Sequence, residues 1–383
     1  MFRRIALFLS IIAAVSLPAR AAMETSAEHA LLMDATTGQV LWEKAGLTPM
    51  PPASMSKLMT VELLFSRIKD GRVKLDDTFP VSERAWRTQG SKMFVEMGSR
   101  IKVEDLIRGI IIQSGNDACV VVAEALGGTL EGFVDMMNKR AKVLGLKQST
   151  FVNPDGLPDP PGQLMSALDL ATLARHLIND YPQLYHYFSE REFTWHNIRQ
   201  PNRDLVLGSL PGADGLKTGH TDASGYGITI SAKRGNQRLI LVLNGLRYPQ
   251  YNNDYFPNIR RAEEAARVME MAFREFRSYP VASAGQVLGQ IPVADGAQPS
   301  VSVNVAKPIA VTMQVDSHAG MKVRLQADPG LKAPVRQGQK VGSLVISAPA
   351  FPSLMVPVYA AQDVAPVGIF GRMMTALRHL WKK

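Results

Sequence analysis

Hydrophobic positions in the first two thirds of the chain follow two periods, one helical and one strand-like. Residues 55–68 contain only three charged side chains over more than three turns, which is typical of a buried helix. Apolar or amphipathic runs predict further helices at 103–108, 116–126, 131–144, 166–179 and 260–276. Short apolar runs on either side of turn residues predict β-hairpins at 30–42 and 225–243. This mixture predicts an α/β (α+β) domain.

Period-two runs replace the helical pattern after residue 277. They occur at 301–305, 322–325 and 343–346, and turns that contain glycine separate them. Short strands with this spacing predict a small all-β sandwich. No nucleophile or cluster of ligand residues occurs in this part of the sequence, so we interpret it as a spacer.

The N-terminal segment has a pattern of its own. Residues 1–21 combine Arg3 and Arg4, an apolar run and a small-x-small site that ends at Ala21, which is typical of a signal peptide for export. The apolar run is shorter than the roughly 18 to 20 residues that a membrane span needs. We therefore predict a signal peptide at 1–21, an α/β domain at 22–277 and a β-sandwich domain at 278–363.

The C-terminal segment, 364–383, is predicted to form an amphipathic helix. At 100° per residue, the apolar side chains of 369–383 fall on one arc and most of the basic ones on the other. Such a segment is too short to span a bilayer, but it can lie in the membrane surface, where anionic lipid attracts its basic face. We favour this membrane anchor over a helix that packs on the protein.

Composition adds the class of protein and its charge. The 383 residues are 46% hydrophobic and 20% charged, which can supply a sizeable core in two domains. The formal net charge of +9 falls to +6 without residues 1–21, which contain three arginines and no acid. Cys119 is the only cysteine, so no internal disulfide can form, and its apolar neighbours predict a buried structural thiol. The seven histidines lack metal-ligand spacing, and we expect no metal, no cofactor and no nucleic-acid partner.

Ser54 and Lys57 are the first candidates for chemistry. Pro51 and Pro52 end the preceding segment, so Ser54 lies at or near the first turn of the helix predicted at 55–68. Positions three apart share a helix face, so the two side chains can touch, and the positive end of the helix dipole favours negative charge beside Ser54. Because a polar pair inside an apolar helix costs stability unless it is satisfied, we interpret the pair as a nucleophile with an amine partner.

Two further polar triplets follow. Gly115 permits a tight turn that presents Ser114 and Asn116 side by side at a helix start, although a simple N-cap is the commoner meaning of this triplet alone. The segment from Lys217 to Gly219 is predicted on a strand next to the hairpin at 225–243. A strand there offers a peptide carboxylate a cation, a hydroxyl, room for close approach and free edge groups.

In this order, the motifs Ser-x-x-Lys, Ser-x-Asn and Lys-Thr-Gly resemble the signature of penicillin-binding proteins and class A β-lactamases. The longer stretches 52–60, 114–118, 193–200 and 215–221 resemble low-molecular-mass D-alanyl-D-alanine carboxypeptidases of the penicillin-binding protein 5 and 6 type, peptidase family S11. The resemblance covers the chain from about Ala30 to the C-terminus. One departure is Asp155, at a position where the family often carries histidine.

The resemblance implies a β-lactamase/transpeptidase-like fold and a serine-type D-alanyl-D-alanine carboxypeptidase. Such an enzyme removes the terminal D-alanine from the pentapeptide stems of peptidoglycan and binds β-lactam antibiotics covalently. Ser54 would form the acyl-enzyme after Lys57 takes its proton, and burial and the charge of Lys217 would keep Lys57 neutral. Ser114 would pass a proton to the departing amine, and Asn116 would hold both Lys57 and the substrate.

The resemblance also implies a substrate site and a location. The substrate-binding residues that it implies are Lys217, Thr218, Gly219, His220 and Arg261. Lys217 and Thr218 would bind the terminal carboxylate, and the N–H groups of Ser54 and His220 would form the oxyanion hole. A solvated helix arginine is an almost equally good interpretation of Arg261, and Arg199 is a weaker candidate. The protein would lie at the periplasmic side of the bacterial inner membrane, held peripherally by the C-terminal helix.

The sequence leaves other functions open. A D,D-endopeptidase that cuts peptidoglycan cross-links would use the same residues. A class A β-lactamase needs a glutamate that clears the acyl-enzyme quickly, and none occurs between Asn153 and Ala167. A non-catalytic peptidoglycan-binding scaffold would require a damaged motif, whereas all three motifs are intact.

Overall fold

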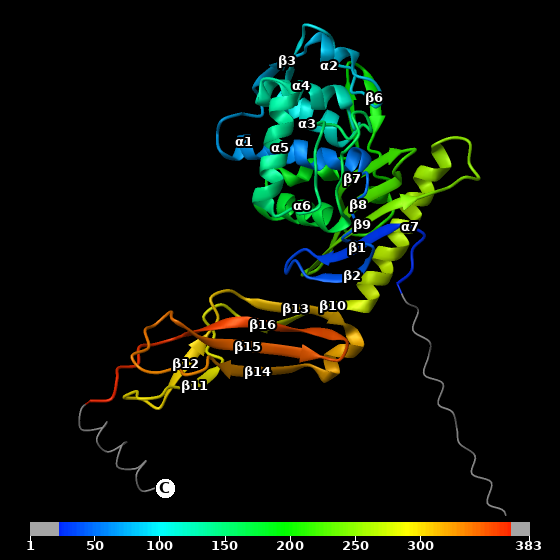
Figure 1. Ribbon diagram of the computed structural model, residues 1–383. Helices are drawn as coiled ribbons and strands as arrows, with labels where there is room; N and C mark the ends of the chain where they lie inside the picture. The colour runs from blue at the N-terminus through cyan, green and yellow to red at the C-terminus, as the bar shows by residue number, and fades with distance from the viewer. Residues whose placement is uncertain (1–22, 369–383) are drawn as a thin grey trace, which may run out of the picture.

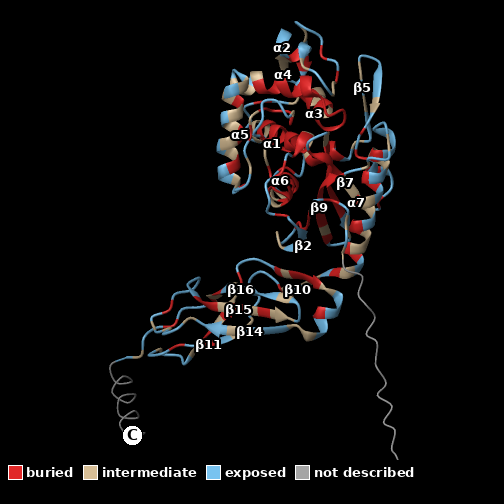
Figure 2. Ribbon diagram, turned by 45° about the vertical axis from the view of Figure 1, so that its right-hand side comes forward, coloured by how far each residue is buried: buried red, intermediate tan, exposed pale blue. Residues whose placement is uncertain are grey.

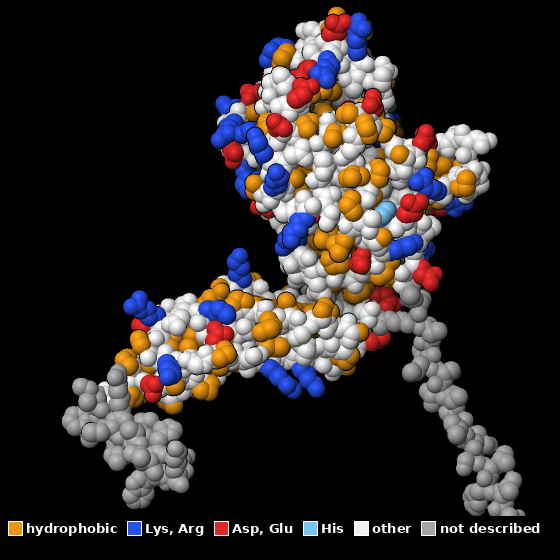
Figure 3. Space-filling view, in the orientation of Figure 1, with side chains coloured by type: hydrophobic (Ala, Val, Ile, Leu, Met, Phe, Trp, Pro, Cys, Tyr) orange, Lys and Arg blue, Asp and Glu red, His pale blue; other side chains and the backbone are white. Residues whose placement is uncertain are grey.

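The computed structural model describes residues 23–368, which form an α/β part and an all-β part (Figure 1). The signal peptide predicted at 1–21 and the amphipathic helix at 369–383 lie outside the described residues. Between residues 23 and 368, no helix is long and apolar enough to cross a membrane. Basic and acidic side chains are interspersed over the face shown in Figure 3.

A five-stranded antiparallel sheet lies at the centre of the α/β part, in the order β2-β1-β9-β8-β7. Its strands are β1 His29–Asp34, β2 Val40–Lys44, β7 Ala213–Thr221, β8 Gly225–Arg234 and β9 Gln237–Leu246. The hairpins predicted from the sequence are confirmed, because β1 pairs with β2 and β8 pairs with β9. Since β7 is the last strand of the sheet, one of its edges pairs with no other strand of the sheet.

Helices cover both faces of this sheet (Figures 1 and 2). The α-helices are α1 Lys57–Lys69, α2 Glu83–Arg87, α3 Val103–Ile111, α4 Asn116–Gly127, α5 Leu130–Leu144, α6 Ala167–Asp180 and α7 Tyr255–Glu275. Short 3-10 helices are η1 Ala53–Ser56, η2 Tyr185–Ser189 and η3 Leu205–Gly208. Two small hairpins complete this part, β3 Thr78–Pro80 with β4 Arg100–Lys102 and β5 Glu192–Trp195 with β6 Ile198–Pro201.

Alternation along the central strands divides the core into two clusters. Leu31 and Met33 of β1 belong to the cluster that contains the buried side chains of α1 and α3 to α6. Ala30 and Leu32 point to the opposite face, where they join the cluster that contains α7. Because both faces of the sheet are buried, its strands read as continuous apolar runs in the sequence. Helix α1, which follows Ser54, is the buried centre of the first cluster (Figure 2).

The all-β part is a sandwich with a core of its own. A five-stranded sheet in the order β11-β12-β16-β15-β14 accompanies a two-stranded sheet of β10 and β13. The strands are β10 Phe276–Ala282, β11 Gly289–Pro292, β12 Ser300–Asn304, β13 Ile309–Gln314, β14 Lys322–Ala327, β15 Lys340–Ala348 and β16 Phe351–Ala360, with the 3-10 helix η4 at Val315–Gly320. Val364 still pairs with Val335 of this part. The sandwich matches the sequence prediction.

The two parts are joined by the chain and by a buried hydrogen bond. Helix α7 ends at Glu275 and β10 begins at Phe276, so no linker separates them. Thr312 Oγ1 of β13 donates to Asp34 Oδ2, at the end of β1, over 2.6 Å. Both side chains are fully buried. This bond therefore fixes the sandwich to the central sheet, far from the exposed edge of β7 (Figure 1).

Candidate active site

Ser54 lies in η1, the 3-10 turn that leads into α1. Lys57 is the first residue of α1, and its Nζ lies 2.7 Å from Ser54 Oγ. Lys57 is fully buried, while Ser54 is half-buried and lines a cleft. The structure therefore brings together the two side chains that the three-residue spacing predicts on one face.

Lys57 has two further contacts, and both are with acceptors. Its Nζ donates to Asn116 Oδ1 at 2.8 Å and to the backbone carbonyl of Asp155. A neutral amine has two N–H donors, which these acceptors use, and one lone pair, which then faces the hydroxyl of Ser54. Burial lowers the pKa of Lys57 and outweighs nearby acidic groups that raise it. The geometry thus suits an uncharged lysine that accepts the serine proton.

Ser114 and Asn116 lie on either side of Gly115, where α4 begins. Ser114 has a φ of +58°, a conformation that non-glycine residues rarely adopt and that often occurs at functional sites. Its Oγ accepts from Lys217 Nζ at 3.0 Å, and Asn116 Nδ2 donates to the carbonyl of Gln89 at 2.7 Å. Neither side chain caps the helix, so the triplet is not a simple N-cap.

Lys217 is the second buried lysine of the site. It is 2% exposed, and its Nζ also donates to the carbonyl of Thr218 at 3.0 Å. Burial lowers the pKa of Lys217 well below the usual lysine value, and the charges of Lys57, Arg203 and Arg261 lower it further. Each serine of the site is therefore held by its own buried lysine.

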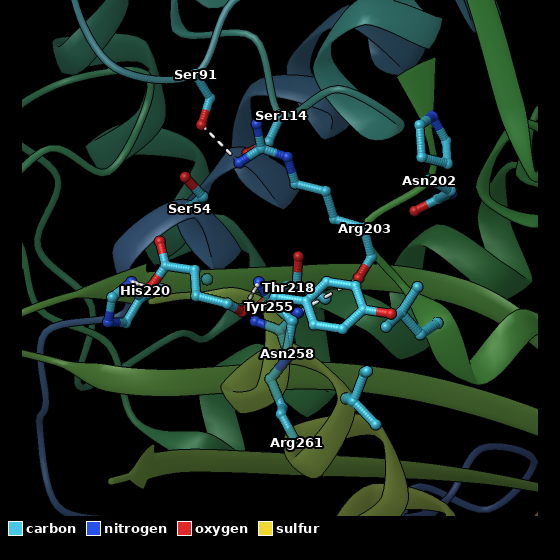
Figure 4. A pocket seen from close by; sticks show the side chains of 15 residues that line it. Ser54, Ser91, Ser114, Asn202, Arg203, Thr218, His220, Tyr255, Asn258 and Arg261 are labelled. Carbon is cyan, nitrogen blue, oxygen red and sulfur yellow. Dashed lines mark hydrogen bonds and ion pairs between the residues drawn. The ribbon is translucent and has the colours of Figure 1, made fainter. Parts of the chain in front are cut away.

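Strand β7 approaches η1 closely at Gly219. A Cβ on this residue would lie 2.9 Å from the carbonyl oxygen of Pro52 and 3.1 Å from the backbone nitrogen of Ser54. Only glycine permits this approach, because both neighbours are backbone atoms that cannot rotate away. Thr218 and His220, on either side of Gly219, line the cleft below Ser54 (Figure 4).

The cleft has a volume of about 600 Å³. Its polar lining residues are Ser54, Ser91, Ser114, Asn202, Arg203, Thr218, His220, Asp254, Tyr255, Asn258 and Arg261. Figure 4 shows Ser91, Ser114 and Ser54 on one side of it and Thr218 and His220 on β7 on the other, with Tyr255 in front. Ser54 and the edge of β7 therefore face the same space.

Arg261 lines the cleft from α7 and is not a solvated helix arginine. It is 2% exposed, and its Nη2 donates to the carbonyl of Arg203 at 3.3 Å. Its Nε has no hydrogen-bond partner among the described residues. Burial lowers the pKa of Arg261 to about 10, so the side chain remains cationic at neutral pH. Arg199, by contrast, pairs with Glu192 on the β5–β6 hairpin and does not line the cleft.

Sequence reasoning missed the residues that close the outer side of the cleft. Arg203 extends across it, and its Nη1 donates to Ser91 Oγ at 2.7 Å (Figure 4). Tyr255 and Asn258 come from the first turns of α7, which begins before the start predicted at residue 260. No motif marks these positions, and the one signal is a group of aromatic residues in a polar stretch at 251–256.

Two further sequence candidates have structural roles in the described residues. Asp155 meets Lys57 through its backbone, while its carboxylate accepts from the N–H of Leu157 at 3.1 Å. Cys119 is fully buried, and burial raises the pKa of its thiol to about 12, so it is no nucleophile. Residues 23–368 contain no group of histidine, cysteine or acidic side chains that could hold a metal ion.

Comparisons with known proteins agree with this geometry. A family model described as D-alanyl-D-alanine carboxypeptidase matches residues 15–246, more than half of the chain. A second model, described as the C-terminal domain of penicillin-binding protein 5, matches residues 276–366. The chain is 33% identical to the D-alanyl-D-alanine carboxypeptidase DacF of Bacillus subtilis over 89% of this chain and 87% of the relative. It is 34% identical to the D-alanyl-D-alanine carboxypeptidase DacC of Escherichia coli over 90% of this chain and 85% of the relative.

Solved structures give the same result. Penicillin binding protein 5 from Haemophilus influenzae is similar with a TM-score of 0.81 and 32% identity, over 89% of this chain and 98% of that one. Penicillin-binding protein D2 from Listeria monocytogenes, solved in an ampicillin-bound form, is similar with a TM-score of 0.59 and 28% identity, over 66% of this chain and 100% of that one. The resemblance stated from the sequence motifs is confirmed, and the chain belongs to the D-alanyl-D-alanine carboxypeptidase family, peptidase S11.

Proposed function

We propose that Ser54 is the nucleophile through which this serine-type D-alanyl-D-alanine carboxypeptidase removes the terminal D-alanine from peptidoglycan pentapeptide stems. The observation that carries this assignment is the environment of Lys57. Its Nζ lies 2.7 Å from Ser54 Oγ, and its other two contacts are acceptors. No other serine along the cleft has a buried amine with this set of partners.

Acylation follows from these contacts. Lys57 takes the proton of Ser54 as Oγ attacks the carbonyl carbon between the last two D-alanines. Ser114, held by Lys217, relays a proton to the departing D-alanine amine, and Asn116 keeps Lys57 in place. The N–H groups of Ser54 and His220 stabilise the oxyanion that forms between η1 and β7. Water then hydrolyses the ester and restores Ser54.

Polar and cationic groups at one end of the cleft would recognise the end of the stem peptide. Lys217 and Thr218 bind the terminal carboxylate, Gly219 leaves room for its approach, and Arg261 adds a positive charge. The unpaired Nε of Arg261 supports this role, because a buried guanidinium needs an acceptor. A peptide laid along the unpaired edge of β7 would add a strand to the sheet.

A D,D-endopeptidase is the second candidate. The same residues would serve both reactions, because only the leaving group differs. We further propose that β-lactam antibiotics acylate Ser54, because they present a strained carbonyl and a carboxylate to the same groups. A non-catalytic scaffold is disfavoured by the intact contacts between lysines and serines.

Mass analysis of products tests the proposed function. A pentapeptide stem should lose one D-alanine, whereas release of monomers from cross-linked dimers would identify the endopeptidase. Ser54→Ala should abolish both product and labelling by fluorescent penicillin. Ser56→Ala is a matched control, since the hydroxyl of Ser56 donates to the carbonyl of Ala53 at 2.9 Å and stays outside the cleft. Turnover by Ser54→Ala would overturn the assignment.

We also propose how the chain is divided and where it acts. A boundary near residue 277 between the α/β domain at 22–277 and the sandwich at 278–363 is supported by the change from α7 to β10. Export by residues 1–21 and attachment to the periplasmic membrane surface by 369–383 are supported by their residue patterns. Deletion of 369–383 should release the protein from membranes without loss of activity on soluble peptide. A truncated form that still sediments with membranes would contradict the anchor.

A further inference from the structure

Three aromatic side chains form an exposed cluster beside the cleft. Tyr255 and Phe256, the first two residues of α7, are 68% and 48% exposed, and their ring centroids lie 5.2 Å apart. The ring of Phe256 also stacks on that of Tyr251, with centroids 5.4 Å apart and planes 21° apart. Single exposed apolar side chains are common on protein surfaces, whereas several in contact mark a candidate binding surface. We call these three residues the aromatic cluster.

The segment that carries the aromatic cluster is held by its own hydrogen bonds. The backbone N–H of Tyr255 donates to Asn253 Oδ1 at 3.0 Å, and Arg260 Nε donates to the hydroxyl of Tyr251 at 3.3 Å. Pro257, which follows the cluster, is buried. A surface that is ordered before it binds loses less conformational entropy on binding. The cluster is therefore preformed for a ligand.

The aromatic cluster is continuous with the cleft and lies beside the end of β7. Tyr255 lines the same cleft as Ser54 (Figure 4). Arg247, at the start of the segment, donates to two backbone carbonyls of the turn at 222–224, over 3.2 and 3.3 Å. This turn follows β7, so the segment projects next to it, before α7 begins (Figure 1).

The proposed roles of the β7 residues give the direction of the bound stem peptide. Its terminal carboxylate would lie at Thr218, and the carbonyl that precedes the last residue would lie at the N–H of His220. The earlier residues of the stem would therefore continue past His220 towards the turn at 222–224. The aromatic cluster thus lies on the side of the N-terminal part of the substrate and not on that of the departing D-alanine.

The charged side chains around the aromatic cluster already have partners. Between residues 247 and 260 there are three of them, and each is paired within the protein: Arg247 with Glu28 at 3.0 Å, Asp254 with the hydroxyl of Tyr226 at 2.5 Å, and Arg260 with Glu263 at 2.8 Å. An anionic headgroup or a charged peptide would therefore have to break an existing pair to gain one here. A neutral ligand would not.

The chemistry of the aromatic cluster suits a sugar ring. A pyranose has a face of C–H groups that can pack on an aromatic ring, and hydroxyl and acetamido groups at its rim. Asn252 and Asn253 are exposed next to the cluster and offer amide donors and acceptors to such a rim. Aromatic side chains with a few convergent polar groups are typical of small-ligand sites.

We propose that the aromatic cluster is a subsite for the glycan strand of peptidoglycan, on which a sugar ring stacks while the end of its stem peptide lies at Ser54. This inference rests on the proposed function, which places the stem in the cleft. Stems are joined to the glycan through their N-terminal residue, and the four residues before the scissile bond span at most about 14 Å when extended. Because the sugar does not react, its binding should lower KM and leave kcat unchanged.

Two substrates that differ only in their sugar test the proposal on the full chain. One is a pentapeptide stem that carries its N-acetylated disaccharide, and the other is the same pentapeptide without sugar. Release of D-alanine by the unchanged protein should show the lower KM for the first substrate. In Phe256→Ala, the ratio of kcat/KM for the first substrate to that for the second should fall by roughly three- to tenfold, through KM. Phe256→Tyr should keep the ratio, because an aromatic face remains.

Trp86→Ala is the matched control. Trp86 is also an exposed aromatic residue, 45% exposed, but it belongs to α2 and does not line the cleft. Its replacement should leave the ratio as it is in the unchanged protein. Thermal unfolding should show that both alanine variants are folded, and the comparison of the two substrates on the unchanged protein needs no variant.

Three results would overturn the proposal. One is an equal KM for the two substrates in the unchanged protein. Another is an equal loss with both substrates in Phe256→Ala, which would assign the cluster to the peptide or to the fold. The third is the same fall in the ratio in Trp86→Ala. Failure of the unchanged protein to release D-alanine from either substrate would instead refute the proposed function, so the two failures are distinguishable.

Discussion

Replacement of Gly219 by alanine tests whether the contact between β7 and η1 is needed for acyl transfer. The new Cβ would lie 2.9 Å from the carbonyl oxygen of Pro52 and 3.1 Å from the nitrogen of Ser54, whereas ordinary contacts begin at 3.4 Å. Since both neighbours are backbone atoms, β7 must move away from η1 by roughly 0.5 Å. The two segments, η1 and β7, that would supply the proposed oxyanion N–H groups then lie farther apart.

The expected effect is on catalysis more than on folding. Loss of one oxyanion donor typically slows acyl transfer by about 10²- to 10³-fold, so we expect acylation of Gly219→Ala by fluorescent penicillin to slow roughly 100-fold. Gly208→Ala is the matched control, because Gly208 lies in η3 with open space around its missing side chain. Thermal unfolding should show that both variants are folded. Acylation of Gly219→Ala at the rate of the unchanged protein would refute the close-approach argument.

Two predictions concern the framework of the site. Glu62 on α1 has a fully buried side chain, which accepts from Arg140 at 2.6 Å and lies 3.2 Å from His176. Because Glu62→Gln removes the charge that pairs with Arg140, it should lower the free energy of unfolding in urea by about 3 kcal/mol at pH 7. Burial raises the pKa of Glu62, but hydrogen bonds from His176 and Arg140 lower it overall. The difference in unfolding free energy between Glu62→Gln and the unchanged protein should therefore shrink as pH falls below about 4.5, where the carboxylate becomes protonated. A difference that stays constant with pH would contradict this prediction. Thr312→Val should lower the free energy of unfolding by about 1 to 3 kcal/mol, because Asp34 Oδ2 loses its hydrogen-bond donor. Acylation of Ser54 by fluorescent penicillin should continue. Unchanged unfolding would show that the bond between the two parts is dispensable.

Local geometry made the first half of the site predictable from the sequence. Ser54 and Lys57 are three residues apart in one helical segment, so their contact follows from helix periodicity alone. The apolar run around them predicted the burial that lowers the pKa of Lys57. The central hairpins were also predictable, because their strands are adjacent in the sequence.

Contacts between distant segments could not be derived in this way. Lys217 and Ser114 are 103 residues apart, and family resemblance, not spacing, linked them. Arg203 and Asp254 gave no signal, because their place at the cleft depends on how η3 and α7 pack against the sheet. The resemblance implied Arg261 as a substrate-binding residue, but the sequence left a solvated helix arginine almost equally plausible, and only the packing of its neighbours reveals that it is buried.

The pH dependence of acylation tests the central claim, that Lys57 is an uncharged base in the folded protein. The measurement is the second-order rate constant of fluorescent penicillin on Ser54 from pH 5 to 11. A base is active above its pKa, and the pKa of Lys57 is lowered from 10.5, so the rate should rise and level off before that pH. A rate that keeps rising until about pH 10.5 would mean an ordinary charged lysine and would contradict the mechanism.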